Sequence, residues 1–228
     1  MKMKWGALVV DGRNKIGGHV ASKNRNGSYL RTKVTPVNRQ STAQTTVRNR
    51  LSTISKTWHT ITQAQRDAWS SAVSNYKKTD IFGDIQNPSG FNLYQKLNNN
   101  IMTLGGTIIT TPPVVAALDG ISDVVLTYTV GTPALSIAST ITAGTDHGFK
   151  VFATAPQSAG KNFVKSEYKL ILVGTAALGA TLSILSAYTD VFGTVGVVGQ
   201  KIFVKVVACG AVSGSEGIPI ATSTISVA

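Results

Sequence analysis

Apolar residues in the first half of the chain recur with the period of an α-helix. Four of them follow one another at intervals of four, three and four residues: Val47, Leu51, Ile54 and Trp58. Residues at this spacing lie on one face of a helix, so the pattern predicts a helix over Thr42–His59. Arg48 and Arg50 lie outside that face. The first predicted helix is therefore amphipathic, with its arginines off its apolar side.

Two more helices are predicted after the first. The tetrapeptide Thr62–Gln65 has the form of a capping box, in which the threonine caps a backbone N–H and the glutamine reaches back. The helix that follows carries Ala68, Trp69, Ala72, Val73 and Tyr76. A third helix starts near Ser89 and places on one side Phe91, Tyr94, Leu97 and Ile101. Short loops favour antiparallel neighbours, so we expect a helical domain over residues 41–104 in which Trp58 and Trp69 pack together.

After Leu104 the helical period gives way to short runs rich in β-branched residues. Gly105-Gly106 and Pro112-Pro113 mark the change, because paired prolines cannot continue a helix. We therefore place a linker at residues 105–113 and a β-rich domain at residues 114–228. The candidate strands are Asp123–Val130, Leu135–Thr142, Phe149–Ala155, Tyr168–Gly174, Ala180–Ser186, Lys201–Cys209 and Thr222–Val227. About seven short strands are typical of an immunoglobulin-like or fibronectin-like β-sandwich.

One of these runs, Lys201–Cys209, is apolar on both faces of the strand. Its apolar residues include Ile202, Phe203, Val204, Val206 and Val207. A sheet with one face in water needs apolar residues at alternate positions only. The run therefore indicates either a central strand buried on both sides or a face that another subunit covers.

Residues 1–40 have the pattern of an extended arm with a hairpin. The segments His19–Ser22 and Tyr29–Lys33 flank Asn26-Gly27, a pair whose positive φ angles suit a tight turn. Pro36 disfavours helix in the residue before it and fits an extended connector. The expected fold is thus a multidomain α+β chain: a basic arm, a small helical bundle and a β-sandwich.

The charge of the chain is confined to its N-terminal part. The formal net charge is +12, and residues 101–228 hold six lysines and six acids, so the whole excess lies in residues 1–100. Residues 1–60 hold twelve basic groups and a single acid, Asp11. Such asymmetry indicates an anionic partner for this part of the chain. The candidate contact residues are Arg13, Lys15, Lys23, Arg25, Arg31, Lys33, Arg39, Arg48 and Arg50.

Three interpretations of the basic part are open. The arm docks on an acidic protein surface within an assembly, ordering as it binds. Alternatively it neutralises the phosphates of a nucleic acid without reading sequence, because no helix-turn-helix, zinc-finger or RNA-binding-sheet signature is present. In the third interpretation the charge is a solvated face that keeps the protein in solution.

The residues needed for catalysis or metal binding are sparse. The three histidines, His19, His59 and His147, have no metal-binding spacing, and one cysteine excludes a multi-cysteine zinc site. Asp80 and Asp84 form the closest acidic pair, for which solvated loop carboxylates are the expected state. Cys209 is expected to be a buried thiol. We therefore predict no enzymatic activity, no cofactor and no metal site.

Membrane insertion is not expected either. The apolar runs are shorter than the roughly 18 residues of a membrane span, and the first residues lack the apolar segment of a signal peptide. We therefore expect a protein that is made in the cytoplasm and remains in solution or joins an assembly.

Several short motifs resemble those of one group of proteins. In order they are Gly17-Gly18, Tyr29-Leu30-Arg31, Thr35-Pro36-Val37-Asn38, Thr42-Ala43-Gln44 with Val47-Arg48, Trp58 with Ile61-Thr62, Gln65-Arg66 with Ala68-Trp69, and Ser89-Gly90-Phe91-Asn92-Leu93-Tyr94. This order resembles virion structural proteins of tailed bacteriophages and prophages, especially those of Bacteroidetes hosts and including crAss-like phages. The C-terminal half is similar to the immunoglobulin-like modules of such proteins in the motifs Phe152-Ala153-Thr154-Ala155-Pro156 with Ser158 and Gly160, Tyr188 with Phe192-Gly193, and Gly199 with Lys201-Ile202. Ile61 stands where leucine is usual.

The resemblance implies a component of the virus particle, assembled in the host cytoplasm, with no catalytic residues. It favours a head–tail connector or ring protein near the portal, with portal, capsid or ring subunits as partners and a homo-oligomeric state. A head-decoration protein and a DNA-binding accessory protein in contact with packaged DNA are the alternatives. A carbohydrate-binding sandwich is less favoured, because sugar recognition usually uses exposed aromatic residues and the C-terminal half has no tryptophan.

Overall fold

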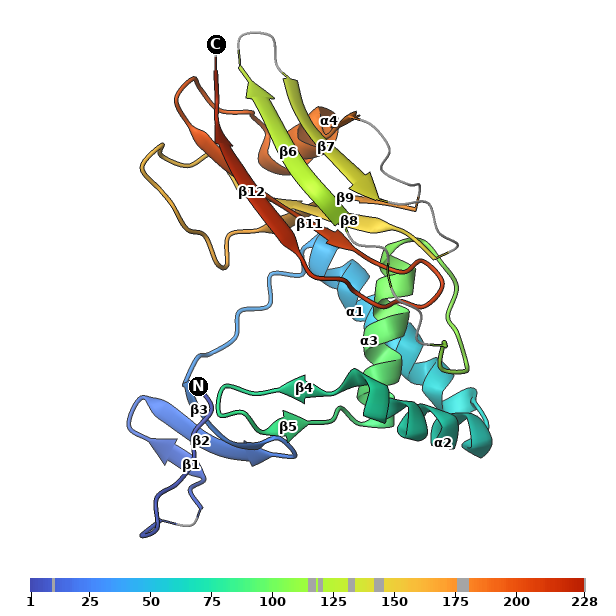
Figure 1. The fold of residues 1–228 in the computed structure, drawn as a ribbon. Helices are drawn as coiled ribbons and strands as arrows, with labels where there is room; N and C mark the ends of the chain where they lie inside the picture. The colour runs from blue at the N-terminus through green and yellow to red at the C-terminus, as the bar shows by residue number, and fades with distance from the viewer. Residues whose placement is uncertain are drawn as a thin grey trace.

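The chain folds into a mixture of α-helices and antiparallel β-sheets, as the α+β prediction requires (Figure 1). The structure is a computed structural model. It describes residues 1–9, 11–114, 118, 121–130, 134–141, 146–175 and 181–227. None of the helices in these ranges is long and apolar enough to cross a membrane.

The three predicted helices are all present in the middle of the chain. Their bounds are Thr42–Thr60 for α1, Gln63–Ala72 for α2 and Gly90–Thr103 for α3. α2 continues as a 3₁₀ turn over Val73–Tyr76. Ser41, Thr62 and Ser89 cap the helices by accepting a hydrogen bond from the backbone N–H three residues later. The capping box at Thr62 is confirmed in both directions.

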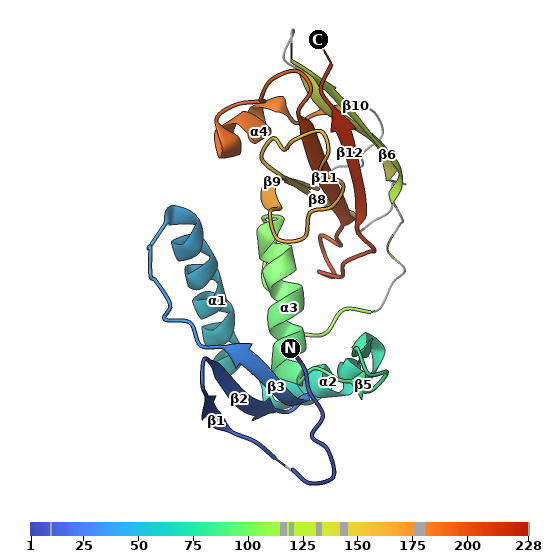
Figure 2. The same ribbon diagram turned by 90° about the vertical axis from the view of Figure 1, so that its left-hand side faces the viewer.

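Tyr94 of α3 lies at the centre of the helical core. Its ring centroid is 5.0 Å from that of Trp58 and 5.3 Å from that of Trp69. The two tryptophans therefore meet through Tyr94, whereas the sequence predicted that they pack on each other. The reason is visible in Figure 2, where α2 lies across the lower ends of α1 and α3 instead of running beside α1.

The apolar face of α1 is covered over only part of its length. Ile54 is fully buried and Trp58 is half-buried, but the side chains of Val47 and Leu51 are 55% and 48% exposed. The periodicity thus identified the apolar face correctly, while the first turns of α1 extend beyond the part that α3 covers.

The second half of the chain contains two antiparallel sheets that share an apolar core. Their strands are β6 (Ile121–Thr129), β7 (Ala134–Ile141), β8 (Phe149–Ala153), β9 (Lys169–Gly174), β10 (Thr181–Ser183), β11 (Lys201–Ala208) and β12 (Ile220–Ile225). One sheet has the order β10-β7-β6 and the other β12-β11-β8-β9. Both contribute to the core, for example through Leu126 and Tyr128 of β6 and Val151 and Val204 of the second sheet.

The predicted strand Ala180–Ser186 is wrong in its second half. β10 ends at Ser183, and α4 spans Leu185–Phe192. Tyr188 on this helix is fully buried in the shared core, and its hydroxyl donates a hydrogen bond to the carbonyl oxygen of Thr154 at 2.9 Å. Gly193 ends the helix with a left-handed φ of 78°. The predicted strand ends at Thr142 and Ala180 lie outside the described residues.

β11 is a central strand that the chain itself buries on both faces. It lies between β12 and β8, and its even-numbered residues from Ile202 to Ala208 point into the shared core. On the other face, Phe203 and Val207 are only 6% and 8% exposed. Of the two interpretations of this apolar run, the buried central strand is therefore the one observed.

The helices and the sheets are joined by a buried polar contact. The side-chain amide of Asn100 on α3 donates to the carbonyl oxygen of Gly214 at 2.7 Å and accepts from the ammonium of Lys150 at 2.8 Å. The same ammonium lies 2.9 Å from a carboxylate oxygen of Glu216. Asn100 and Lys150 are both 5% exposed. The sequence left open whether the two halves touch, and these bonds show that they do.

Part of the predicted linker is bound to the helical core. The indole N–H of Trp69 donates to the carbonyl oxygen of Thr110 at 2.8 Å, and the backbone N–H of Ile109 donates to the side chain of Asn98 at 2.7 Å. Ile108 and Ile109 also pack against the helical cluster. The composition change near Leu104 therefore marks the end of α3, while the chain stays on the helical body for several more residues.

The first 32 residues contain a small antiparallel sheet. Its strands are β1 (Asn14–Ile16), β2 (His19–Asn24) and β3 (Gly27–Thr32). The predicted hairpin is present, but its turn residues are Arg25 and Asn26, and only Gly27 has a positive φ, 101°. The side chain of Asn24 accepts from the backbone N–H of Asn26 and shapes this turn. β1 has no counterpart in the sequence prediction.

Candidate functional site

The basic arm folds as what we call the N-terminal module, residues 1–41. The first residues add to the outer edge of β3: the backbone N–H of Met3 donates to Ser28, and that of Leu30 donates to Met1. Among the described residues of the module only Ala21 is buried. The module is therefore a thin sheet with almost no core of its own.

One face of this sheet carries a row of basic side chains. Lys15 on β1 and Arg31 on β3 both lie directly opposite Val20 on β2. Residues opposite each other in antiparallel strands point to the same side. Tyr29 lies two residues before Arg31 and shares this face. Since Lys15 and Arg31 are exposed, the face presents two cations to solvent beside an aromatic ring.

The other predicted contact residues of the module lie elsewhere. Lys23 is two residues from Ala21 and therefore points to the opposite face. Arg25 occupies the exposed turn, and the guanidinium of Arg13 pairs with Asp11 at 3.2 Å. Lys33 follows β3, and Arg39 lies in the extended connector to α1; both are exposed.

The two arginines of α1 differ in their surroundings. Arg48 is exposed in the first turns of the helix, beside Val47. Arg50 is half-buried and donates a hydrogen bond to the hydroxyl of Thr103 at the end of α3. Arg48 is therefore available to a partner, whereas Arg50 holds α1 against α3.

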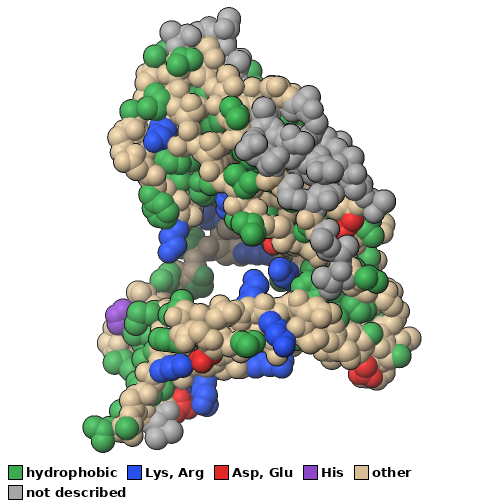
Figure 3. Space-filling view, viewed as in Figure 1, with side chains coloured by type: hydrophobic (Ala, Val, Ile, Leu, Met, Phe, Trp, Pro, Cys, Tyr) green, Lys and Arg blue, Asp and Glu red, His purple; other side chains and the backbone are tan. Residues whose placement is uncertain are grey.

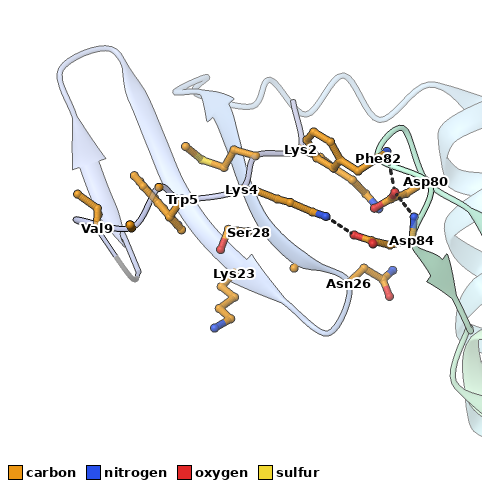
Figure 4. Close-up of a pocket in the computed structure, with 14 residues that line it drawn as sticks. Lys2, Lys4, Trp5, Val9, Lys23, Asn26, Ser28, Asp80, Phe82 and Asp84 are labelled. Carbon is orange, nitrogen blue, oxygen red and sulfur yellow. Dashed lines mark hydrogen bonds and ion pairs between the residues drawn. The ribbon is translucent and has the colours of Figure 1, made fainter.

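A two-stranded finger from the helical part holds the module. It consists of β4 (Lys78–Thr79) and β5 (Ile85–Gln86) with the turn between them. The ammonium of Lys2 lies 3.2 Å from Asp80, and that of Lys4 lies 2.8 Å from Asp84 (Figure 4). The side-chain amide of Gln86 donates to the carbonyl oxygen of Asn26 at 3.1 Å. Two ion pairs and one hydrogen bond thus fasten the sheet to the finger.

Asp80 organises the turn of the finger. Its carboxylate accepts hydrogen bonds from the backbone N–H groups of Phe82 at 2.8 Å and of Asp84 at 3.0 Å, as well as from Gln86. Burial acts to raise the pKa of Asp80, but these backbone N–H donors and Lys2 outweigh it, so the pKa lies below its usual value. The carboxylate is therefore held in its charged form.

The two ion pairs, Lys2–Asp80 and Lys4–Asp84, are the part of the site that sequence reasoning missed. Asp80 and Asp84 were expected to be a solvated pair, and each instead has a lysine partner. The available signal was the match between two lysines, Lys2 and Lys4, and two aspartates on the same loop. Nothing in the sequence aligns the two segments, because 78 residues separate Lys2 from Asp80.

A hollow of about 510 Å³ lies between the module and the finger. Lys23 and Ser28 of the sheet, Trp5 of the first residues and Phe82 of the finger all border it (Figure 4). Lys4 crosses it, with its ammonium 5.2 Å from the centroid of the Phe82 ring. Because Lys2 and Lys4 each pair with an aspartate across it, the hollow is a junction that holds the module in place.

Apolar side chains are exposed next to the basic ones. In the connector Val34 and Val37 are 68% and 78% exposed, and on α1 Val47 and Leu51 are about half exposed. Residues 12–66 contain no acidic residue. Figure 3 shows Lys and Arg side chains gathered on the N-terminal part and around a second opening, which lies between this part and the sheets. The surface from the connector to α1 is therefore both basic and apolar.

Within the described part of the chain, no three histidine, cysteine or acidic side chains come together where they could hold a metal ion. Cys209 is fully buried, as predicted. Compared with known proteins, the chain matches no family model, no curated protein and no solved structure.

Proposed function

We propose that this chain is a non-enzymatic structural protein of a tailed-phage virion that clamps a neighbouring subunit through its N-terminal module. One observation carries the proposal: the module is a basic sheet in which one of the described residues is buried, and a finger holds it away from the main body. A three-stranded sheet is stable by itself only if it has a hydrophobic face or packs against a helix. A partner surface supplies the packing that this module lacks.

A protein partner fits this surface better than DNA does. The phosphate backbone of DNA is bound by cations and hydrogen-bond donors, and exposed aliphatic side chains add nothing to that contact. Val34, Val37, Val47 and Leu51 lie among the basic residues and gain free energy only when an apolar surface covers them. The partner we propose is therefore an acidic protein surface with an apolar strip, as on a portal, capsid or ring subunit.

A second copy of the same surface does not meet this requirement. Residues 12–66 hold basic groups and no acid, so two copies facing each other through this surface repel. A homo-oligomer that uses the module must therefore pair it with a different region of the next copy. Head-to-tail contacts of this kind form a ring where the rotation between neighbouring copies closes, and an open filament where it does not. This supports a head–tail connector or ring protein near the portal over a head-decoration protein.

For the second half of the chain we propose an immunoglobulin-like or fibronectin-like sandwich that presents an outer surface. Two antiparallel sheets of three and four strands with one shared core support this. The buried contact between Asn100 and Lys150 holds the helical part, which carries the module, against the proposed sandwich. The proposed protein is therefore a rigid adaptor with one basic, apolar contact surface.

The test is the composition of purified virions. A ring near the portal places about a dozen copies in each particle, whereas a shell protein is present in hundreds. Quantitative mass spectrometry of particles gives this number directly. Absence of the protein from particles contradicts the proposal.

Deletion of residues 1–40 tests the role of the module. We expect the shortened protein to fold through its two apolar clusters and to be missing from particles. The double variant Lys15→Ala with Arg31→Ala should lower incorporation, while Lys77→Ala, an exposed lysine outside the module, should leave it unchanged. Strong binding of the intact protein to a DNA column, lost near physiological salt, favours the DNA-binding alternative instead.

A further inference from the structure

A second surface, on the four-stranded sheet, has the features of a ligand-binding groove. The loop at residues 162–168 runs along the outer face of β11 and β12 and leaves a groove of about 510 Å³. Small-molecule sites in proteins commonly have volumes of this size. The groove is lined by Asn162, Phe163, Val164, Tyr168, Phe203, Lys205, Ala221, Thr222 and Ser223.

Lys205 provides a positioned cation at this groove. Its ammonium lies 4.7 Å from the ring centroid of Phe152 and 4.7 Å from that of Tyr168. In the described part of the chain no carboxylate pairs with it. Two aromatic faces hold the charge in place without neutralising it. The ammonium is therefore ready to bind an anionic group of a ligand.

Phe163 provides an exposed aromatic face at the rim. Its side chain is 73% exposed, and its neighbour Val164 in the same loop is buried and anchors the loop. An exposed phenylalanine beside a groove offers a flat apolar surface on which a ring can stack. The aromatic residue that sugar recognition requires is thus present, although the sequence has no tryptophan in this half.

Polar groups complete the lining. The side chains of Asn162 and Ser223 bring one amide and one hydroxyl group to the groove, since Ser223 lies opposite Phe203 on the outer face. Among the described residues neither of these two side chains forms a hydrogen bond within the protein. Hydroxyl and amide groups both donate and accept, which matches the alternating donors and acceptors of a polyhydroxylated ligand.

We propose that this groove binds an acidic saccharide, a sugar ring that carries a carboxylate. The apolar face of the sugar stacks on Phe163, its hydroxyl groups bond to the side chains of Asn162 and Ser223, and its carboxylate pairs with Lys205. Carboxylate–ammonium hydrogen bonds are stronger than those between neutral groups, so the charge selects acidic over neutral sugars.

A nucleic-acid strand fits the same groove less well. Binding of single strands uses a track of several cations together with the stacking rings. The lining holds one cation, Lys205. Of the lysines nearby, Lys161 is paired with Glu167 at 2.6 Å, while Lys165 in the same loop and Lys201, 5.3 Å from the centroid of the Phe203 ring, lie outside the lining. The second half of the chain also has no net charge. This inference does not rest on the proposed function, because it concerns a different surface.

The test uses the full chain and three probes in calorimetric titrations at low salt: an oligogalacturonate, its methyl ester as the neutral counterpart, and a thymidine oligonucleotide. We expect the oligogalacturonate to bind at least about tenfold more tightly than its methyl ester. Equal binding of both sugars, preferential binding of the oligonucleotide, or no binding of the acidic sugar overturns the proposal.

Three variants locate the site. Phe163→Ala and Lys205→Gln should each weaken oligogalacturonate binding by about tenfold or more. Lys77→Gln removes the same charge from an exposed position in the helical part and should leave binding unchanged. Because Phe163 is exposed, its substitution leaves the fold intact, which a thermal unfolding scan verifies. Undiminished binding by Phe163→Ala contradicts the assignment of the groove.

Discussion

The ammonium of Lys150 on β8 lies 2.8 Å from the side-chain oxygen of Asn100 on α3, in a contact that is almost fully shielded from water. A buried lysine is costly unless hydrogen bonds and a counter-charge compensate it. Asn100 and Glu216 supply these, and Asn100 also bonds to the backbone at Gly214. The helices and the sheets are therefore coupled through one charged group that neither half satisfies alone.

Replacing Asn100 by alanine should destabilise the whole chain. The substitution removes one partner of a buried ammonium and leaves the carbonyl of Gly214 without its donor, which we expect to cost about 2–3 kcal/mol in the free energy of unfolding. Denaturant unfolding followed by circular dichroism measures this. The control is Asn99→Ala, the adjacent and partly exposed residue on α3, for which a change below about 0.5 kcal/mol is expected. Equal effects of the two variants contradict the proposed coupling.

The ion pairs at the finger should control the order of the N-terminal module. In Asp80→Asn the pairing with Lys2 is lost and the turn that also positions Asp84 is weakened. We expect backbone amide exchange in β2 and β3 to become at least about tenfold faster, because the module has almost no core to maintain it. Hydrogen-exchange mass spectrometry reads this region separately from the sheets.

Asp67→Asn is the matched control for that experiment, since Asp67 is an exposed aspartate on α2. It should leave exchange in the module unchanged. Exchange in β11, inside the core that the two sheets share, should be the same in both variants. Faster exchange throughout the chain in Asp80→Asn would show that the finger stabilises the main body and does more than hold the module.

Acid should release the module in the same way. The pKa of Asp80 is lower in the folded protein than its ordinary value of 3.8. A lowered folded pKa means that the carboxylate stabilises the junction above pH 3.8, and that this contribution is lost as the pH falls through the folded pKa. Amide exchange in β2 and β3, corrected for the intrinsic pH dependence, should therefore rise only below pH 3.8. A rise already at pH 5 contradicts the assignment to Asp80.

The elements that sequence analysis predicted correctly are those with local signals. The start of α2 follows from the Thr62 capping box, whose partners are three residues apart. β1 and the β4–β5 finger have no such signal, because strands of two or three mostly exposed residues show no alternation. The first two residues of α4 were predicted as the end of the strand Ala180–Ser186, because a short apolar run does not distinguish a buried helix from a strand, and the rest of this helix was not predicted.

The site shows the same division. The charge count identified the module and its exposed cations, including Lys15 and Arg31, directly from composition. The ion pair between Lys4 and Asp84 depends on how distant segments come together, which composition does not encode. Periodicity identified the apolar face of α1, but only the packing of α3 decides that Ile54 is covered and Leu51 is not.

The exposed half of that face should matter for assembly and not for folding. Val47→Ser with Leu51→Ser alters two half-exposed side chains, so we expect the free energy of unfolding to change by less than about 1 kcal/mol. Incorporation into virions should fall strongly, because a partner covers these side chains in the proposed complex. By contrast, Ile54→Ala should cost about 2–5 kcal/mol. Full incorporation of the double variant would show that the partner contacts a different surface.

Cys209 should lower the stability of the protein at alkaline pH. Burial raises the pKa of its thiol to about 11, against 9.0 for an exposed thiol. Because the unfolded chain loses this proton first, stability is unaffected below pH 8 and decreases as the pH rises between 9 and 11. The thiol should account for about 1 kcal/mol of the loss between pH 8 and pH 10. Other groups titrate in this range, so the measurement is the difference between the wild type and Cys209→Ala, each unfolded by denaturant at both pH values. The variant starts from a lower stability because it leaves a small cavity, but its loss on going to pH 10 should be smaller by that amount.

Alkylation by iodoacetamide tests the burial of Cys209 independently. At pH 8 iodoacetamide should alkylate Cys209 only at the rate of unfolding, since the buried thiol is neither charged nor accessible. Rapid alkylation of the folded protein would contradict the burial on which the pH dependence rests.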